Sequence, residues 1–197
     1  MPQYTAKPYD PALDNLRGIS AETNQAHYKL YEAYVNKANE ALERLKAADK
    51  SKANQIFSDY RSAAIDLSFA IGGIKNHQIY FHHLGGDGKP VDGAFKHQVE
   101  KDFGSWDNYI ADLTAAGMAA RGWAWTAWDD DFQLLYNSVG DAQNTFPIWN
   151  AHPIVGLDVY EHAYINDFST ARPKYIEAFL DNMDWHVVEE AFNRVRH

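Results

Sequence analysis

The feature that most constrains the fold is a pair of long periodic stretches in the first half of the chain, separated by a polar break at residues 46–52. Apolar residues in each stretch recur at steps of three and four, the period of one face of an α-helix. The first stripe consists of His27, Leu30, Tyr31, Tyr34, Ala38, Leu42 and Leu45. The second consists of Ile56, Tyr60, Ala63, Leu67, Ile71, Ile74, Phe81 and Leu84. The pattern predicts a long antiparallel helical hairpin.

Local signals mark where this hairpin begins and ends. Ser20 is a suitable N-cap for the first helix, and Glu22 lies in its first turn, where the helix dipole favours a negative charge. The segment "GGDGKP" at 85–90 is typical of a loop. We therefore expect two domains, 1–88 and 89–197.

The second half predicts a mixture of helices and strands. Asp92 and Ser105 are expected to cap helices over 93–102 and 106–120. Two further helices are predicted over 171–183 and 186–195, the first with Pro173 just inside its start.

Three strands are expected between these helices. The segments "GWAWTAW" and "FQLLYNSV" flank the turn-like "DDD", and "HPIVGLDV" supplies a third strand that ends at Asp158. The predicted fold class is α+β: an N-terminal long antiparallel helical hairpin, and a C-terminal mixed domain with a small antiparallel three-stranded sheet and helices.

Composition excludes several classes of protein. A hydrophobic fraction of 46% is enough for a packed interior, and a net charge of -9 argues against nucleic acid as a partner. No apolar run approaches the eighteen or so residues of a membrane span, and the first residues do not form a signal peptide, so a cytoplasmic protein is expected. The chain has 0 cysteines, which excludes disulfides and thiolate catalysis.

Four residues could form a metal site. His27 and His77 lie on the two apolar stripes, where an imidazole with unused nitrogens costs desolvation free energy. Each alone is explained as well by a core histidine, and the pair Asp158 and His162 by a buried ion pair or a helix cap. Together they offer three imidazoles and one carboxylate, a set that suits Mn or Fe and also permits zinc with hydrolytic chemistry.

One segment carries a specific resemblance. "DVYEHAYINDF" at 158–168, followed by "ARPKYIEAF" and "MDW", closely resembles the C-terminal signature of the iron/manganese superoxide dismutases. Only Tyr160 departs from the family's usual Asp-Val-Trp-Glu-His-Ala-Tyr. The segments "PYDPALDNLRGIS", "YVNKANEAL", "GGIKNHQIYFHHLGGDGKP", "FGSWDNYIADL" and "RGWAWTAW" agree in order and spacing, so the resemblance runs essentially end to end.

The resemblance implies a metal site between the two domains. His77, Asp158 and His162 match three of the family's metal ligands, Tyr34 matches the gateway tyrosine of its substrate channel, and Gln143 matches the residue that hydrogen-bonds to solvent on the metal. The resemblance also assigns the aromatic wall and the dimer-bridging residues. These are Trp123 and Trp125, and Glu161 and Tyr164, respectively.

The first ligand departs from the family pattern. The family places it eight residues before the gateway tyrosine, which is Ala26 here, and a channel histidine four before it, which is Leu30. His27 lies seven residues before Tyr34, and positions seven and eight apart share one side of a helix. We therefore expect His27 to be the fourth ligand.

The implied function is a superoxide dismutase that converts superoxide to oxygen and hydrogen peroxide by alternating reduction and oxidation of one bound Mn or Fe ion. Gly73 together with Gln143 resembles the manganese-type pattern, so Mn is favoured. The resemblance further implies an antioxidant homodimer, or a homotetramer, that binds neither nucleic acid nor membrane. Lys29 and Arg172 are expected to attract the superoxide anion locally.

Two other functions stay open at this point. The first is a superoxide-dismutase-like structural or assembly protein with a degraded metal site, which Ala26, Leu30 and Tyr160 would favour. The second is a zinc hydrolase, for which the sequence reveals no catalytic base.

Overall fold

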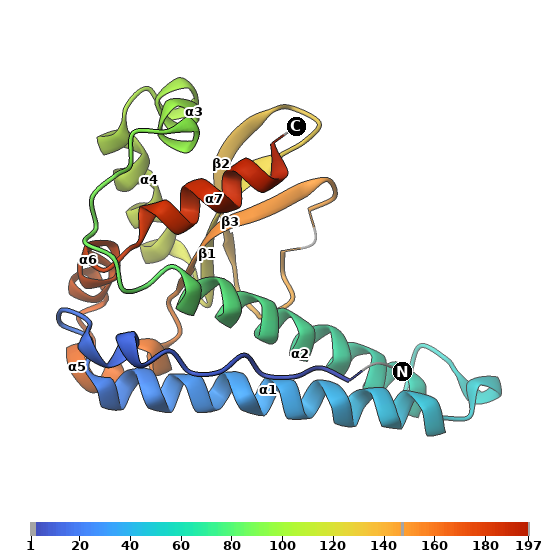
Figure 1. The fold of residues 1–197 in the computed structure, drawn as a ribbon. Coiled ribbons are helices and arrows are strands. Elements are labelled where there is room, and N and C mark those ends of the chain that lie inside the picture. The colour runs from blue at the N-terminus through green and yellow to red at the C-terminus, as the bar shows by residue number, and fades with distance from the viewer. Residues whose placement is uncertain (1–2, 147, 197) are drawn as a thin grey trace.

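Two long antiparallel helices form the N-terminal half of the computed structural model, which describes residues 3–146 and 148–196. Helices α1 (Ala21–Ala47) and α2 (Asp59–His82) pack against each other and lie side by side in Figure 1. A small apolar core lies between them, built on Tyr31, Val35 and Ala38 of α1 and on Ala70 and Ile74 of α2. The predicted helical hairpin is confirmed.

Side-chain caps set where the two helices begin. The Ser20 hydroxyl accepts a hydrogen bond from the Thr23 backbone N–H at 3.2 Å, as expected for the N-cap of α1. Ser58 caps α2 in the same way, by accepting from the N–H of Arg61. The helix therefore begins after Ile56, whose side chain is 69% exposed. The prediction that Ile56 belongs to the buried stripe is wrong, because the cap at Ser58 starts the helix beyond it.

The second half contains a three-stranded antiparallel sheet in the order β2-β1-β3. Its strands are β1 (Trp123–Asp129), β2 (Leu134–Gly140) and β3 (Ala151–Asp158). The central strand β1 is buried along nearly its whole length, which explains its run of tryptophan and alanine. The expected α+β class and the three strands are confirmed.

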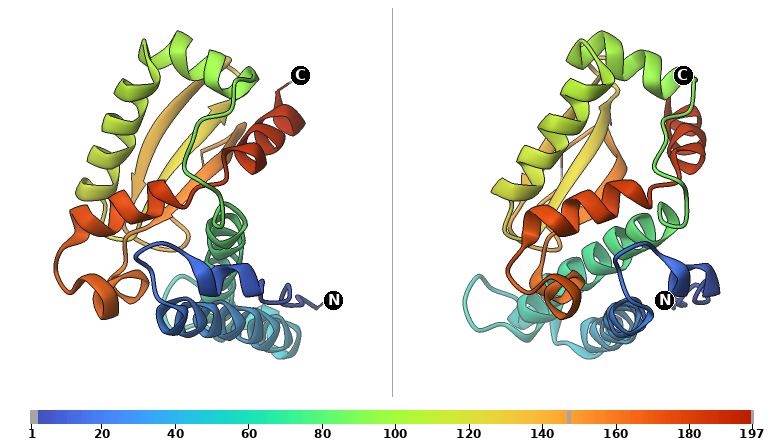
Figure 2. Two further views of the ribbon diagram at one scale, coloured as in Figure 1. Left: turned by 60° about the vertical axis from the view of Figure 1, so that its left-hand side comes forward. Right: turned by 90° about the vertical axis from the view of Figure 1, so that its left-hand side faces the viewer.

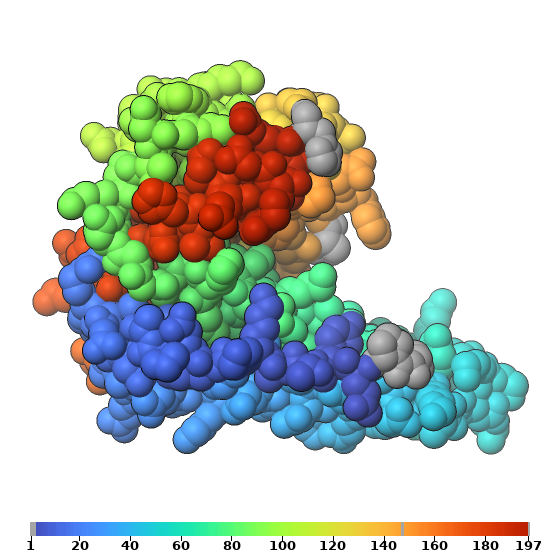
Figure 3. Space-filling view, in the orientation of Figure 1, coloured from blue at the N-terminus to red at the C-terminus, as the bar shows by residue number. Residues whose placement is uncertain are grey.

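Five further helices complete the second half of the described chain. They are α3 (Ala94–Phe103), α4 (Trp106–Ala119), α5 (Ile165–Phe168), α6 (Arg172–Asp181) and α7 (Trp185–Val195), with short 3-10 turns at Pro11–Asn15, Lys50–Lys52 and Glu161–Ala163. Among these helices, α3, α4 and α7 pack on the sheet. Helix α4 packs on β1 and β2, whereas α7 and α2 pack on β3 (Figure 2). Figure 3 shows the far end of the hairpin reaching beyond the C-terminal half. No helix in the described part of the chain is long and apolar enough to cross a membrane.

The N-terminus of α3 is held differently from the prediction. Its N-cap is Gly93, without a side-chain hydrogen bond, so the prediction of Asp92 as the cap is wrong. The carboxylate of Glu189, on α7, instead accepts from the N–H groups of Ala94 at 2.9 Å and Phe95 at 2.7 Å. A distant residue therefore satisfies the free N–H groups of this helix. The predicted cap of α4 is confirmed, because Ser105 accepts from the N–H of Asn108.

Candidate metal centre

Four side chains from separate elements converge where the hairpin meets the sheet. His27 comes from α1, His77 from α2, Asp158 from the end of β3, and His162 from the turn that follows. The Oδ2 atom of Asp158 lies 3.0 Å from Nε2 of His27, 3.1 Å from Nε2 of His162 and 3.8 Å from Nε2 of His77. One ligand atom from each residue lies within 4.8 Å of every other. The structure brings together all four predicted ligands.

Helical register decides which residue of α1 enters this cluster. His27 is 1% exposed, whereas its neighbour Ala26 lies on the exposed side of the helix. Leu30, which stands where the family has its channel histidine, is 38% exposed. The seven-residue spacing between His27 and Tyr34 therefore still brings the imidazole to the side that faces the other three groups.

Backbone hydrogen bonds orient the other cluster residues. Nδ1 of His77 lies 2.7 Å from the backbone oxygen of Gly73, one turn earlier in α2. That oxygen can only accept, so Nδ1 carries the proton and Nε2 faces the cluster with its lone pair. At the end of β3, Oδ1 of Asp158 accepts from the N–H of Tyr160 at 2.9 Å. This bond supports the turn that returns His162 to the carboxylate.

The protonation states within the cluster follow from burial and from the single carboxylate. Burial lowers the pKa of His27, and it lowers the pKa of His77 to about 3. Burial alone would raise the pKa of Asp158, but the imidazoles of His162 and His27 hold it well below its usual value. The pKa of His162 is raised, because its bond to Asp158 outweighs its burial. The cluster thus offers an ionised carboxylate and at least two neutral imidazoles, the forms that bind a metal.

The donor set fits one first-row metal ion. Two ligand atoms that each lie about 2.1 Å from an ion are about 3 Å apart at right angles and about 4.2 Å apart on opposite sides. The observed separations of 3.0, 3.1 and 3.8 Å from the carboxylate oxygen match this range. Within the described chain, Nε2 of His77 is buried without a hydrogen-bond partner. A metal ion would satisfy that atom, and three imidazoles with one carboxylate suit Mn or Fe.

Aromatic residues and one glutamine form a wall beside the cluster. The indole N–H of Trp123 donates to Oε1 of Gln143 at 3.0 Å, and the Trp123 ring packs edge-on against His77. Trp125 stacks on Trp123 with ring centroids 6.3 Å apart. The ring of Tyr34 lies 5.4 Å from that of His77. All four predicted wall and channel residues are thus gathered on this side of the cluster.

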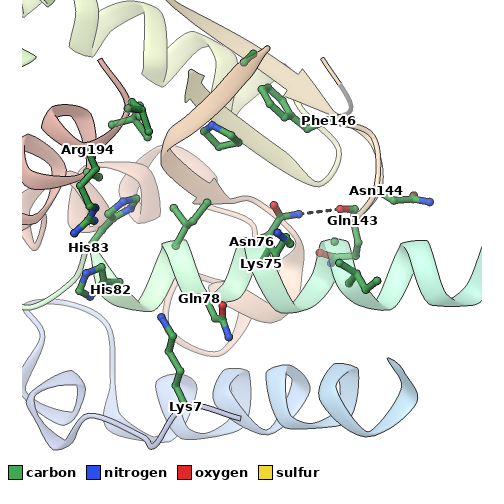
Figure 4. Close-up of a pocket in the computed structure, with 18 of the residues that line it drawn as sticks. Lys7, Lys75, Asn76, Gln78, His82, His83, Gln143, Asn144, Phe146 and Arg194 are labelled. Carbon is green, nitrogen blue, oxygen red and sulfur yellow. Dashed lines mark hydrogen bonds between the residues drawn. The ribbon is translucent and has the colours of Figure 1, made fainter. Parts of the chain in front are cut away.

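Three residues of this region were missed by the sequence analysis. Asn76 donates from Nδ2 to the backbone oxygen of Gln143 at 3.0 Å (Figure 4), and its Oδ1 accepts from the Trp125 indole at 3.3 Å. The Tyr175 hydroxyl donates to the backbone oxygen of Asp158 at 2.7 Å, and Tyr80 packs against His27. In the sequence, only the position of Asn76 next to the candidate ligand His77 could have pointed to its role.

The two predicted dimer-bridging residues lie beside the cluster in different environments. Glu161 is exposed, whereas Tyr164 is 4% exposed and stacks on Tyr175. The Tyr164 hydroxyl accepts from Nε of Arg172 at 3.3 Å, and Arg172 also donates to the backbone oxygen of Ala120. Arg172 is therefore engaged within the chain.

Tyr160 takes the place of a tryptophan without leaving a gap. Its ring stacks on His162 at a centroid distance of 5.4 Å, and its hydroxyl donates to the backbone oxygen of Asp141. A Cβ atom added to Gly122 would meet the Tyr160 ring at 2.8 Å, so the phenol is closely packed. The flat ring of Tyr160 therefore supports the His162 imidazole by stacking on it.

Comparison with known proteins agrees with this geometry. Residues 3–85 match the alpha-hairpin domain of the iron/manganese superoxide dismutases, and residues 91–191 match their C-terminal domain. The chain is 41% identical to "Superoxide dismutase [Fe]" of Aquifex pyrophilus, over 91% of this chain and 87% of that protein. It is 33% identical to "Superoxide dismutase [Fe]" of Methanothermobacter marburgensis, over 94% and 92% of the two chains. It is 31% identical to "Superoxide dismutase [Mn] 1" of Halobacterium salinarum, over 98% and 97%.

Proposed function

The chain belongs to the iron/manganese superoxide dismutase family, and we propose that it converts superoxide at one iron or manganese ion held by His27, His77, Asp158 and His162. In this reaction two superoxide anions and two protons give one molecule of oxygen and one of hydrogen peroxide. The matches favour this enzyme over a structural protein with a degraded metal site, because both halves of the chain resemble the enzymes.

The single observation that carries the metal assignment is the convergence of three imidazole nitrogens on one carboxylate oxygen in a buried place. When bound, the ion supplies the redox chemistry, because it can take an electron from one superoxide and give an electron to the next. Asp158 contributes the negative charge that balances part of the charge of the ion. Neutral His27 and His77 contribute lone pairs without adding positive charge.

Tyr34 and Gln143 are the residues that we assign to proton handling. Burial and the charge of Asp158 raise the pKa of Tyr34, so its hydroxyl stays protonated at neutral pH and can serve as a proton donor. Oε1 of Gln143 accepts from the Trp123 indole, so its amide NH2 group is the part that can donate, and its hydrogen bond to Tyr34 offsets part of the rise in the Tyr34 pKa. Trp123 and Trp125, both fully buried, exclude bulk water from this side of the site.

The identity of the metal is proposed as manganese, with iron as the other candidate. A Cβ atom added to Gly73 would lie 2.6 Å from the Tyr34 ring, so no side chain from this position of α2 can reach the site without displacing that ring. The amide is supplied instead by Gln143 from the segment after β2. This arrangement supports the manganese-type pattern that the sequence suggests.

The remaining proposals concern the assembly and its setting. We propose a cytoplasmic antioxidant homodimer or homotetramer in which Glu161 and Tyr164 bridge two copies, with the exposed carboxylate of Glu161 free to accept a hydrogen bond from a partner.

The two-domain division at residue 88 is proposed because the hairpin supplies two of the ligands and the second half supplies the other two. Lys29 is exposed on α1 and is the better candidate for attracting the superoxide anion, since Arg172 is engaged within the chain.

Metal analysis of the purified protein tests the proposed function. The chain should be expressed with both manganese and iron available, and its metal content should be measured together with the rate of superoxide consumption. The proposal predicts close to one Mn or Fe per chain and an activity that is lost when the metal is removed. A folded protein that contains neither metal, or that contains zinc and does not consume superoxide, would contradict it.

A further inference from the structure

A second cavity lies between α2, β3 and α7, on the face of α2 opposite to the metal cluster. Its volume is about 760 Å³, within the range of small-molecule pockets. At 100° per residue, Lys75 and Ile79 point nearly opposite to His77 on α2. Figure 4 shows Arg194 above α2, where it comes from α7, and Lys7 below α2, where it comes from the N-terminal segment. The cavity therefore lies on the other side of α2 from the cluster, and it adjoins the wall of the cluster through Asn76 and Gln143, which line it.

The charge of the lining is the reverse of that of the whole chain. Lys7, Lys75 and Arg194 line the cavity together with His82, and no aspartate or glutamate is among the described lining residues. In the described part of the chain, no carboxylate oxygen lies within 4.0 Å of the charged nitrogens of these lysines and this arginine. Although the chain as a whole carries a net charge of -9, the charged residues among the described lining residues are all cationic, which favours an anion in this cavity.

Two of the cations, Lys7 and Arg194, lie toward one end of the cavity, where α7 also contributes the apolar Ala191 and Val195. Figure 4 shows Lys7, His82 and Arg194 on one side of the cavity and Phe146 on the other. His82 and Lys75 are seven residues apart on one helix face, which is a separation of about 10 Å along the axis. The apolar part of the lining includes Phe146, Pro153 and Ile154. A matching ligand would carry its negative charge at one end and a flat apolar group at the other.

The backbone of the segment that carries Lys7 is held in place before any ligand binds. The backbone N–H of Lys7 donates to the Tyr31 hydroxyl at 2.8 Å, and Nε2 of Gln78 donates to the same hydroxyl at 3.0 Å. The Tyr28 hydroxyl donates to the backbone oxygen of Lys7. The N-terminal segment is thus tied to both helices of the hairpin where Lys7 enters the cavity, which lowers the entropy that binding would cost.

A buried histidine adds a second, independent indication of a ligand. His83 lines the cavity and is 2% exposed; its imidazole interacts with the Ile154 backbone, but within the described chain its Nδ1 atom makes no hydrogen bond of normal length and angle. A buried nitrogen without a partner destabilises the fold, because its hydrogen bonds to water are lost and not replaced. A polar group of a bound molecule, such as a hydroxyl, would satisfy it.

We propose that this cavity binds an organic phosphate of about nucleotide size. The phosphate lies between Lys7, His82 and Arg194, the apolar ring lies against Phe146, and a hydroxyl group between them reaches Nδ1 of His83. Lys75 adds to the positive potential along the wall of the cavity. The phosphate-binding end, at Lys7, His82 and Arg194, contains none of the residues assigned to the proposed superoxide chemistry.

Calorimetric titration of the metal-loaded full chain with adenosine 5′-monophosphate tests this proposal, with adenosine and inorganic phosphate titrated separately. We expect saturable binding of one adenosine 5′-monophosphate per chain, at least about tenfold tighter than either fragment, because phosphate and ring each contribute. Lys75→Glu and Arg194→Glu should each weaken binding about tenfold or more. Lys101→Glu, an equal charge change at an exposed position of α3, should change it less than about twofold.

A cavity-filling variant provides a second measurement. Ala191 lines the cavity from α7, so Ala191→Trp would place an indole in the space and should abolish binding without changing the net charge. Three results would overturn the proposal: no saturable binding of adenosine 5′-monophosphate, equally tight binding of inorganic phosphate alone, or equal weakening by Lys101→Glu and Lys75→Glu.

Discussion

The two faces of α2 carry polar groups of opposite character. On the face toward α1, His77 is buried beside the ionised carboxylate of Asp158, and burial holds its imidazole neutral. On the opposite face, Lys75 and His82 are exposed and border a cavity without acidic lining residues in the described chain. The first face has the ligands that a metal cation requires, and the second has the charge that an anion requires.

Helix α2 therefore separates two kinds of site, a buried cluster and a partly exposed cavity. A buried cluster must balance its charges within itself, because unpaired charge in the interior is costly. A partly exposed cavity can keep unpaired cations, because water solvates them until an anion binds. Two glycines of α2 lie close to these two sites. Gly72 packs against the Gln143 backbone, and Gly73 packs against the Tyr34 ring.

The largest expected effect is the loss of a predicted ligand on the buried face. His27→Ala should reduce the metal content to less than about a tenth of the wild-type value, because one coordination bond is lost and Asp158 loses a partner. Elemental analysis and the rate of superoxide consumption measure both consequences. His186→Ala, at an exposed position of α7, is the control and should keep full metal content. Full metal content and activity in His27→Ala would show that His27 is not a ligand.

A smaller effect is expected when the wall of the cluster is altered and the ligands are kept. Gln143→Ala should leave the metal in place and lower the turnover number about 10–100-fold, the range for groups that orient a metal site from outside its ligands. The Trp123 indole would also lose its acceptor. Gln25→Ala, an exposed position of α1, is the control. Loss of metal from Gln143→Ala would instead place this residue among the ligands.

The contact between α2 and the segment after β2 gives the next test. A Cβ atom added to Gly72 would lie 2.1 Å from the backbone oxygen of Gln143, so Gly72→Ala must displace that segment. We expect a loss of about 1–3 kcal/mol in the free energy of unfolding, measured with denaturant. Ser62→Ala, at an exposed position of the same helix, should change it by less than about 0.5 kcal/mol. Stabilisation by Gly72→Ala, as helix propensity alone predicts, would show that this contact is loose.

The smallest expected effect concerns the neutral histidine on the cavity side. Burial lowers the pKa of His83 to about 3, below its unfolded value near 6.5. Between these values the unfolded chain binds a proton that the folded chain does not, so stability falls as the pH falls. His83 should contribute up to about 1.4 kcal/mol of lost stability per pH unit between pH 6 and pH 4.5. Denaturant titrations of the metal-free protein should show a weaker pH dependence for His83→Gln, and an unchanged one for His186→Gln.

Much of the fold follows from local patterns in the sequence. The periodic stripes predicted α1 and α2, because each helix buries one face, and the segments that flank the turn-like "DDD" predicted the first two strands of the sheet. The cap of α3 could not be predicted, since Glu189 lies 94 residues from Phe95, which it caps. Ile56 was misplaced because its apolar character fits the period of a helix that a serine starts beyond it.

The site was predictable where a motif placed its residues and not where it depends on packing. The resemblance of the "DVYEHAY" and "NHQIYF" segments to the family predicted three residues of the cluster, and the side of α1 on which His27 lies predicted the fourth. Asn76 was missed because its role depends on contacts with Trp125 and Gln143, which lie on different elements. The cavity was missed for the same reason, since its cations come from three separate segments of the chain.

Anomalous diffraction from crystals of the metal-loaded protein, collected at the manganese and iron absorption edges, tests the central claim most directly. The account predicts a single anomalous peak per chain, about 2.0–2.3 Å from Nε2 of His27, Nε2 of His77, Nε2 of His162 and one carboxylate oxygen of Asp158. A peak beyond bonding distance of Nε2 of His27 would contradict it. A cluster held together only by histidine–aspartate hydrogen bonds, with no ion between the residues, would contradict it as well.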